Sequence, residues 1–401
     1  MRRVAVTGVG AVSACGLGAE ALWRATLEGR SGVREVLFPT MRRQQVTRAA
    51  KLPEGLLASL MEGSKPRFQD PVSVLALAAA REAVEQAGLG PDDFGSRCAV
   101  VWGTGFGGAP TLNAGYHQFI SDPGGRFDPM TVPKVMANAP ASWIGMAYGA
   151  TGPTYCISTA CASATQAIGL GTQLIRGGLA DRCIVGGAES PLVDAQFQAW
   201  ESLHVMSATE CRPFSAGRDG MMLGEGAGVV VLESAEAARE RGARPLAEVA
   251  GYGATSDAAD LLRPDVAGAA ACMRQALADA GIEPSAIGYV NAHGTGTVAN
   301  DMTEAEAIRS AFGPASERLL VSSTKPVHGH ALGAAGALEF IVTLFALREQ
   351  TAPPTLNFTA ADPRVGIEPV PHRPRIFSAE AALTNSFAFG GVNASLVLTQ
   401  A

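Results

Sequence analysis

Short apolar runs alternate along most of the chain with longer segments in which apolar residues recur at helical spacing. The runs 4–12, 98–102 and 184–188 are typical of buried strands. The segments 17–27 and 71–88 are typical of helices, and the second of them ends at a glycine. Strands that alternate with helices of this length form layers around a mainly buried sheet. The pattern therefore predicts an α/β protein.

A unit of helix, turn and strand occurs twice. The aligned segments are residues 81–95 with 274–288, Gly103–Gly105 with Gly294–Gly296 and, more weakly, 224–232 with 390–398. Self-similarity over such a distance indicates repeated architecture. We therefore expect two halves packed about a pseudo-twofold axis, with a boundary near Ala247 that divides the chain into 1–246 and 247–401.

Residues 109–146 interrupt this alternation. They contain polar and aromatic residues with little periodicity, and Asp122-Pro-Gly-Gly and Phe127-Asp-Pro are loop signals. We interpret this segment as an excursion from the layers that caps a pocket or builds a dimer contact.

Cys161 lies in the stretch that organises the chain. Residues 155–157 are a short β-prone run, and Ser158 and Thr159 are good N-cap residues for a helix that continues through Ile175. A cysteine near a helix N-terminus meets backbone N–H groups and a dipole that favour an anion, which lowers the pKa of its thiol. Free cysteines are also commonly buried in cores, so this stretch alone leaves both interpretations open.

Two later stretches bear on Cys161. His293 leaves a buried strand into a glycine-rich turn, where it can act as an acid, a base or a hydrogen-bond donor. Residues 322–339 supply a lysine and two histidines, Lys325, His328 and His330. A lysine in so apolar a context needs a partner, and Glu339 is the nearest candidate in sequence.

Composition narrows the classes of function. The chain has 401 residues, a net charge of −6 and no basic run, which argues against nucleic acid as the main partner. Seven scattered cysteines without paired spacing suit a reducing compartment, so we expect a cytoplasmic protein. No apolar stretch approaches the roughly 20 residues of a membrane span. His328 and His330 could ligate a metal, but no third ligand is evident, and we expect no metal.

Four motifs resemble those of the β-ketoacyl-(acyl carrier protein) synthases, the elongating type II ketosynthases of the thiolase superfamily. They occur in the family order as Ser-Thr-Ala-Cys161-Ala, Asn-Ala-His293-Gly-Thr-Gly-Thr, Ser-Thr-Lys325 with Gly-His330, and Asn385-Ser-Phe-Ala-Phe389-Gly-Gly. The resemblance runs from Val4 to the C-terminus. It implies a thiolase-like duplicated five-layer α/β/α/β/α sandwich, in agreement with the repeat.

The resemblance also implies an acyltransferase that performs decarboxylative Claisen condensation. Cys161 would take the acyl group from a phosphopantetheine thioester. His293 and His330 would bind the malonyl thioester carbonyl, so that loss of CO₂ yields a stabilised enolate. The backbone N–H groups of Cys161 and Phe389 would form the oxyanion hole, and Phe389 would also gate the acyl pocket.

Further residues have supporting roles by the same resemblance. Lys325, with Glu339, would order the two histidines. Thr295 and Thr297 would hold the pantetheine arm. The remaining supporting residues are Asp301 and Phe387.

The expected partners follow from this chemistry. Substrates would arrive on the phosphopantetheine arm of acyl carrier protein, with no bound cofactor. Lys65 and Arg67 would lie beside the entrance and attract the acidic carrier. The resemblance implies a homodimer, or a heterodimer with a chain-length-factor-like subunit. The pathway would be type II fatty acid, polyene (including aryl polyene) or polyketide biosynthesis, and residues 162–167 look closer to polyene-type synthases.

Two other functions remain open, and two positions depart from the family pattern. A non-condensing chain-length-factor-like subunit commonly lacks the nucleophile that this chain retains. A thiolase should have a second catalytic cysteine near the C-terminus, but the last cysteine is Cys272. Where many relatives carry His-x-Thr beside the pantetheine tunnel, this chain has Asp260-Leu-Leu. His328 stands where a hydroxyl residue is common.

Overall fold

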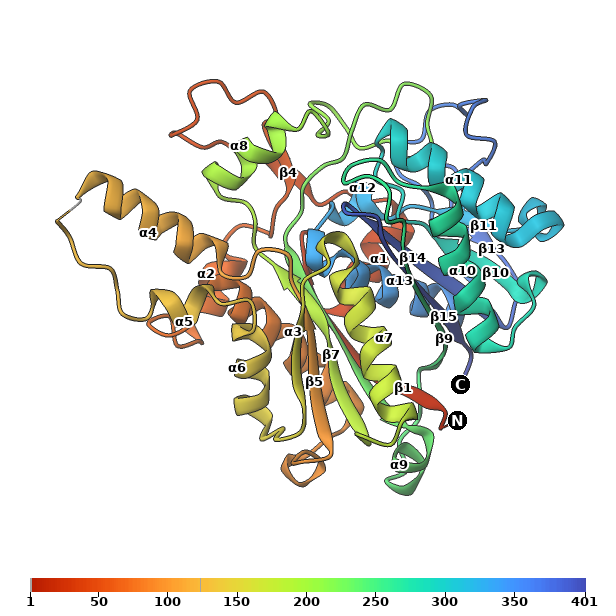
Figure 1. The fold of residues 1–401 in the computed structure, drawn as a ribbon, viewed down its shortest axis with the longest axis horizontal. Coiled ribbons are helices and arrows are strands. Elements are labelled where there is room, and N and C mark those ends of the chain that lie inside the picture. The colour runs from red at the N-terminus through yellow and green to blue at the C-terminus, as the bar shows by residue number, and fades with distance from the viewer. Residues whose placement is uncertain (1, 123) are drawn as a thin grey trace.

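The computed structural model describes residues 2–122 and 124–401, so Pro123, in the predicted loop, lies outside the described residues, as does Met1. A large mixed sheet runs through the molecule (Figure 1), in two runs of five strands. The first run is β1 (Val4–Ser13), β8 (Gly226–Ser234), β7 (Arg182–Glu189), β5 (Cys98–Gly103) and β6 (Thr154–Ile157). The second run is β9 (Ala247–Ser256), β15 (Val392–Thr399), β14 (Ala381–Ala388), β10 (Ile287–Asn291) and β11 (Leu320–Ser322).

The two runs have the same topology. In each, the first three strands pair antiparallel and the last three pair parallel. A short pairing of β1 with β9, Val6 opposite Ala247 and Ala5 opposite Glu248, joins them. The two members of each predicted repeat, including 224–232 and 390–398, occupy equivalent places, which confirms the duplicated fold. The exact division at residue 247 stays a prediction.

Helices complete the layers. The outer helices of the first half are α3 (Pro71–Ala87) and α6 (Ala139–Tyr148), and those of the second are α10 (Val266–Ala280) and α11 (Val298–Phe312). The inner helices are α1 (Ala19–Glu28), α7 (Ser163–Arg176) and α13 (Ala335–Glu349). Because the side chains of α7 and α13 share one core with strands from both halves, these helices form the middle layer of a five-layer α/β/α/β/α sandwich.

Shorter elements lie around these layers. The helices are α2 (Leu56–Glu62), α4 (Ala109–Ser121), α5 (Thr131–Val135), α8 (Asp194–Ser202), α9 (Ala235–Glu240) and α12 (Lys325–His328). The strands are β2 (Gly16–Leu17), β3 (Val33–Glu35), β4 (Arg48–Ala50), β12 (Thr351–Ala352) and β13 (Arg375–Ile376). The predicted excursion contains α4, α5 and α6, and α4 projects away from the sheet (Figure 1). In the described part of the chain, no helix has the length and apolar character that a membrane crossing needs.

The first strand of each half packs against its outer helix through two glycines. A Cβ on Gly8 would lie 2.0 Å from the carbonyl oxygen of Ala83 in α3. A Cβ on Gly251 would lie 2.1 Å from the oxygen of Ala276 in α10. Gly10 and Gly253 make the same approach one turn away. These glycines let helix and strand backbones touch, because any side chain would force them apart.

Candidate active site

Cys161 lies on a tight turn, η2 (Ala160–Ala162), between β6 and α7. Ala160 has a left-handed backbone with φ of 48°, which is strained for a residue with a Cβ. The sequence placed the helix start too early. Ser158 and Thr159 do not cap α7, which begins at Ser163, and the Ser163 side chain accepts from the Thr159 N–H at 2.9 Å. The turn places Cys161 beyond the end of β6, where it lines a cavity together with His293 and His330 of the second half.

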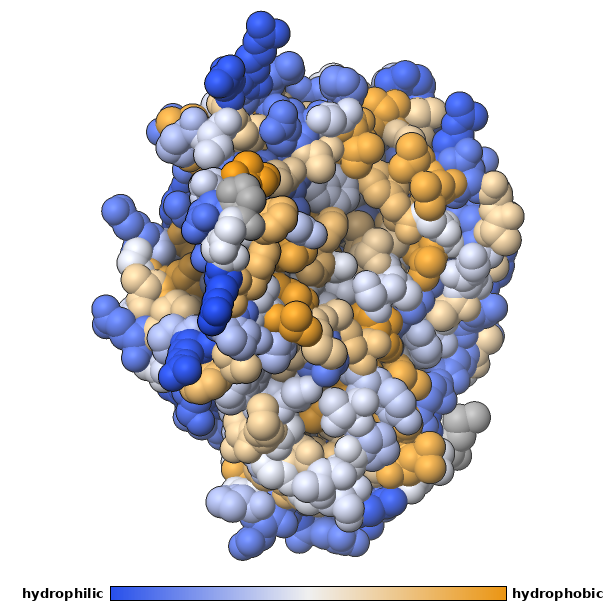
Figure 2. Space-filling model, turned by 60° about the vertical axis from the view of Figure 1, so that its left-hand side comes forward, coloured by the Kyte–Doolittle hydropathy of each residue, from blue (hydrophilic) through white to orange (hydrophobic). Residues whose placement is uncertain are grey.

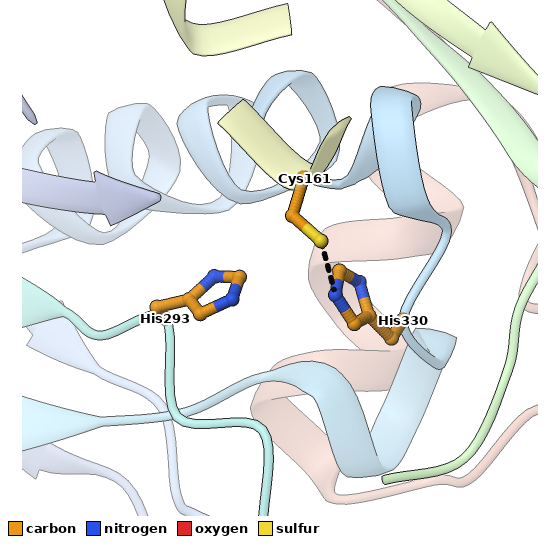
Figure 3. A group of neighbouring side chains, drawn as sticks. All are labelled: Cys161, His293 and His330. Carbon is orange, nitrogen blue, oxygen red and sulfur yellow. Dashed lines mark hydrogen bonds between the residues drawn. The ribbon is translucent and has the colours of Figure 1, made fainter. Parts of the chain in front are cut away.

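The Cys161 thiol meets His330, whose Nε2 lies 3.1 Å from Sγ (Figure 3). Both residues are buried, at 5% and 2% exposure. Burial raises the pKa of the thiol to about 12, against the opposing effect of Lys325. The expectation of a lowered thiol pKa is therefore wrong for the resting site, because desolvation of the thiolate outweighs the charge of Lys325 and a backbone hydrogen bond. His330 is placed to accept the thiol proton when the nucleophile forms.

His293 lies on the other side of the thiol, with its ring centroid 5.3 Å from that of His330. The Lys325 ammonium donates to His293 Nδ1 at 3.3 Å and also to Glu339. Since Lys325 can only donate, Nδ1 accepts and the ring carries its hydrogen on Nε2. Burial, with Lys325 and His330, holds the pKa of His293 well below its ordinary value. His293 is thus a neutral donor.

Buried carboxylates hold the turn that carries His293. Glu304 accepts from the backbone N–H groups of His293 at 2.8 Å and Gly294 at 2.7 Å. Asp301, predicted as a supporting residue, accepts from the Phe214 N–H at 2.7 Å and lies 3.5 Å from Arg218 Nε. Asp301 therefore supports the turn from behind, since it accepts from backbone N–H groups and from the Asn300 side chain and pairs with Arg218 rather than with the histidines.

A cavity of about 150 Å³ opens onto these groups. Thr295 and Thr297 line it with their hydroxyl oxygens 2.9 Å apart. Phe389 also lines it and stacks on Trp200 of α8, with centroids 6.1 Å apart. Phe387 packs edge-on against His293 at 6.4 Å. The cavity is thus apolar along its aromatic wall and polar where the two threonines lie.

The segment Asp260-Leu-Leu, which departs from the family pattern, forms part of the rim of the cavity at Cys161. Leu261 and Leu262 line the cavity and are 72% and 52% exposed. The Asp260 side chain instead accepts from the N–H groups of Leu262 and Arg263. The Gly390 N–H donates to the Leu261 carbonyl at 2.8 Å, which ties this rim to the residue after Phe389. Apolar side chains thus stand at the rim where many relatives carry the polar His-x-Thr pair.

Three residues that the sequence analysis singled out, Lys65, Arg67 and His328, do not join the cluster of Cys161, His293 and His330. Lys65 lines a second cavity, of about 350 Å³, with its ammonium 5.7 Å from the ring of Trp143. Arg67 is exposed and lies over Phe68. Neither lines the cavity at Cys161. His328 is buried, with Nε2 2.9 Å from Thr324 Oγ1, and does not share a ligand cluster with His330.

Sequence reasoning missed Trp200 and Glu304. Trp200 follows no motif, and only the tertiary stack on Phe389 reveals it. Glu304 lies eleven residues after His293 on α11, and no local pattern distinguishes it from the other acidic residues of that helix. Its complete burial could not be read locally.

Comparisons with known proteins agree with this geometry. The family model described as "Beta-ketoacyl synthase, N-terminal domain" matches residues 1–238, and "Beta-ketoacyl synthase, C-terminal domain" matches residues 246–359. The chain is 41% identical over 405 residues to Nodulation protein E of Rhizobium sp. (strain N33), covering 100% of this chain and 99% of that protein. It is 35% identical over 404 residues to 3-oxoacyl-[acyl-carrier-protein] synthase 2 of Staphylococcus aureus (strain N315), covering 99% and 98%.

A solved structure extends the likeness to the whole fold. The ishigamide ketosynthase/chain length factor superposes with a TM-score of 0.94 at 34% identity, covering 100% of this chain and 99% of that one. The family models cover most of the chain, and the curated relatives and the solved structure match over nearly its full length. The chain belongs to the β-ketoacyl synthase family, and it is a condensing enzyme of the acyltransferase class with the thiolase fold.

Proposed function

We propose that the chain condenses malonyl-carrier with an acyl group held on Cys161, releasing CO₂ and forming β-ketoacyl-carrier. The observation that carries this proposal is the convergence of one thiol and two neutral imidazoles, whose ligand atoms lie within 4.8 Å of one another. A thiol suits acyl transfer, and fixed donors suit an enolate. The chemistry needs no metal or resident cofactor, because the thioester arm brings both substrates.

Acyl transfer comes first. The Cys161 sulfur attacks the acyl thioester carbonyl while His330 Nε2, 3.1 Å away, accepts the thiol proton. The carbonyl oxygen becomes an oxyanion, which the backbone N–H groups of Cys161 and Phe389 would bind. When the tetrahedral intermediate collapses, the bond to the pantetheine sulfur breaks, and that sulfur takes the proton from His330. The acyl group stays on Cys161.

Decarboxylation and condensation follow. The malonyl thioester oxygen accepts from His293 Nε2–H, and His330 lies on the other side of the same space. The C–C bond to the carboxylate breaks and CO₂ leaves. The electron pair of that bond stays on the α-carbon and forms an enolate. The enolate carbon attacks the acyl-Cys161 carbonyl, and the sulfur leaves with the electron pair as a thiolate, which takes up one proton from solvent to restore the thiol. The low histidine pKa values support hydrogen-bond stabilisation rather than proton transfer to the enolate.

The carrier would deliver both thioesters through the rim. The hydroxyls of Thr295 and Thr297 can bind the amides of the pantetheine arm, and Leu261 with Leu262 can pack on its apolar parts. Lys65 and Arg67 would contact the acidic carrier at a distance from this chain's own cavity. Their exposure supports an electrostatic role, which salt would weaken.

A dimer is part of the proposal. Among the described residues, strand β6 is paired on one side only and ends the sheet order. Figure 2 brings this side of the molecule forward, and apolar side chains gather on it. The exposed apolar residues of α4, α5, α6 and β6 include Phe119, Ile120, Val132, Met146 and Tyr155. Unpaired edges and large apolar patches are typical of interfaces. The partner would be a second copy or a chain-length-factor-like subunit.

The same features bear on pathway and on the alternative function. The higher identity to a nodulation protein than to a 3-oxoacyl-[acyl-carrier-protein] synthase 2, 41% against 35%, supports a specialised pathway over primary fatty acid synthesis. The Trp200–Phe389 wall suits flat, conjugated chains. Retention of Cys161 in contact with His330 supports a catalyst rather than a non-condensing subunit.

The test uses intact mass. The purified protein and a Cys161→Ala variant are mixed with a panel of acyl-carrier thioesters, and malonyl-carrier is then added. We expect an acyl adduct on the wild type alone, discharged into a product two carbons longer. Absence of an adduct from every donor, alone and with a co-purified partner subunit, would contradict the proposal.

A further inference from the structure

Glu189 is a buried carboxylate that the reaction above does not use. It ends β7 and has 0% exposure. Its Oε2 accepts from the N–H groups of Gly105 at 2.7 Å and Gly333 at 3.0 Å. Its Oε1 accepts from the Phe106 N–H at 3.0 Å and the Thr104 hydroxyl at 3.2 Å. All four donors are neutral, so the carboxylate serves as a multiple acceptor.

These donors belong to different halves of the molecule. Thr104, Gly105 and Phe106 follow β5 in the first half, whereas Gly333 lies on η5 (Leu332–Ala334) in the second. Gly333 comes three residues after His330. The end of β7 also packs between η5 and α7, the helix that follows the Cys161 turn, since a Cβ on Gly187 would lie 2.7 Å from the Gly333 oxygen and 2.9 Å from the Ala164 Cβ. Glu189 therefore joins the turn after β5 in the first half to η5 in the second.

We propose that Glu189 is a positioning residue that fixes the separation of His330 from Cys161 by anchoring the Gly333 N–H to the first half. The inference rests on the proposed function, because it assigns meaning to the His330–Cys161 contact. Oε2 accepts from Gly105 and Gly333 at once, so the turn after β5 and η5 share one acceptor atom. The imidazole that meets the thiol at 3.1 Å then depends on a bond made three residues away.

The charge of Glu189 works against the nucleophile. Burial raises the pKa of Glu189 to about 7, although its four hydrogen bonds oppose this, and the carboxylate in turn raises the pKa of Cys161. A group kept for its charge would ease ionisation of the thiol, and this one hinders it. Its geometry, rather than its charge, is what the site uses.

The test separates geometry from charge. Glu189→Gln loses the charge but keeps an amide oxygen that can take the place of Oε2. Glu189→Ala loses both. The readout is the rate of Cys161 alkylation by iodoacetamide, followed by intact mass, which needs no carrier and no turnover. It therefore stands even if the proposed condensation fails. We expect Glu189→Ala to slow alkylation on the order of 10- to 100-fold, as displaced reacting groups do, and Glu189→Gln to match or exceed wild type.

Loss of charge alone would speed the reaction, so slowing in Glu189→Ala reports displaced geometry. Glu225→Ala is the matched control, because Glu225 is 6% exposed and accepts from the Leu52 N–H in the same half. It should lower the melting temperature without slowing alkylation. If Glu189→Ala does not fold, Gly333→Ala replaces it, since its Cβ would lie 2.6 Å from Glu189 Oε2. Wild-type alkylation in the folded variant, or equal slowing in Glu189→Gln or Glu225→Ala, would overturn the proposal.

Discussion

The two halves of this enzyme build the same turn and use it differently. In the first half, β6 leads through η2 into α7, and in the second, β11 leads through the short helix α12 and then η5 into α13. Each turn begins with a strained left-handed residue, Ala160 with φ of 48° and Leu332 with φ of 44°. The next residue is Cys161 in one half and Gly333 in the other. One copy presents a nucleophile, and the other presents a backbone N–H to Glu189.

The glycine-rich turns after the equivalent strands β5 and β10 differ in the same way. Glu189 binds the N–H groups of Gly105 and Phe106, and Glu304 binds those of His293 and Gly294. Only the second turn carries a reactive side chain. Under the proposed function, the first half would hold the acyl group and the second half would stabilise the enolate. Two equivalent scaffolds would thus divide the reaction through their side chains.

The largest effect that sharpens this comparison is expected at Lys325. Lys325→Met frees His293 Nδ1 and leaves Glu339 buried without its cation. We expect CO₂ release from malonyl-carrier to fall on the order of 100-fold and the free energy of unfolding to fall by roughly 3–5 kcal/mol. CO₂ release is measured by carbon dioxide trapping, and the free energy of unfolding is measured by urea titration. Adding Glu339→Gln should restore stability but not decarboxylation.

The control for the Lys325 variant is an ion pair made by α7, a helix of the middle layer. Arg176 of α7 pairs with Asp279, and its side chain is 9% exposed. Arg176→Met should cost stability and leave CO₂ release per folded molecule unchanged. Equal loss of decarboxylation in both variants would mean that Lys325 acts only through stability, and the division of labour would fail at that point.

A smaller effect is expected at Trp200. Trp200→Leu removes the stack on Phe389, which is worth about 0.5–1.5 kcal/mol for an aromatic pair. If Phe389 acts as the gate, it should leave its stacked position more readily, so that malonyl-carrier loses CO₂ about 2- to 10-fold faster without an acyl group on Cys161. Trp200→Phe should keep the wild-type rate. A Trp200→Leu enzyme with unchanged uncoupled decarboxylation would show that the stack does not hold the gate.

The smallest effect on turnover is expected at His328, although its effect on acid stability is large. Burial, with Lys325, lowers the pKa of His328 from 6.5 to about 3. The unfolded chain therefore binds the proton first, and stability is lost as pH falls below 6.5 towards 3. Each tenfold difference in proton affinity between the folded and unfolded chain is worth about 1.4 kcal/mol. His328→Ser should flatten this loss and leave turnover within about twofold of wild type, since it lies off the cavity. The exposed His372→Ser should change neither, and an unchanged acid slope in His328→Ser would refute the assignment.

The sequence was a good guide to the reactive side chains and a poor guide to their environment. Cys161, His293, Lys325 and His330 lie in local motifs, so they could be found without coordinates. The expected direction of the Cys161 pKa shift was wrong, because the pKa is raised by burial under segments that are distant in sequence. The helix start was wrong because Ser158 looked like a cap. The excursion's helices escaped notice because their exposed apolar faces, as at Met146, blur helical periodicity.

The supporting carboxylates could not be predicted for a similar reason. Glu189 and Glu304 act on backbone N–H groups, which have no sequence signature, and the bond from Gly333 to Glu189 spans 144 residues. The repeat was visible because α3 and α10 pack on glycine-bearing strands in the same way, which constrains local sequence in both halves.

The division of the reaction between the two halves is tested by measuring both half-reactions in two variants. Cys161→Ala and His293→Ala are each assayed for acyl adduct by intact mass and for CO₂ release from malonyl-carrier. We expect that Cys161→Ala forms no adduct but still releases CO₂, and that His293→Ala forms the adduct but loses CO₂ release by roughly 100-fold or more. Loss of both half-reactions in each folded variant would contradict this division.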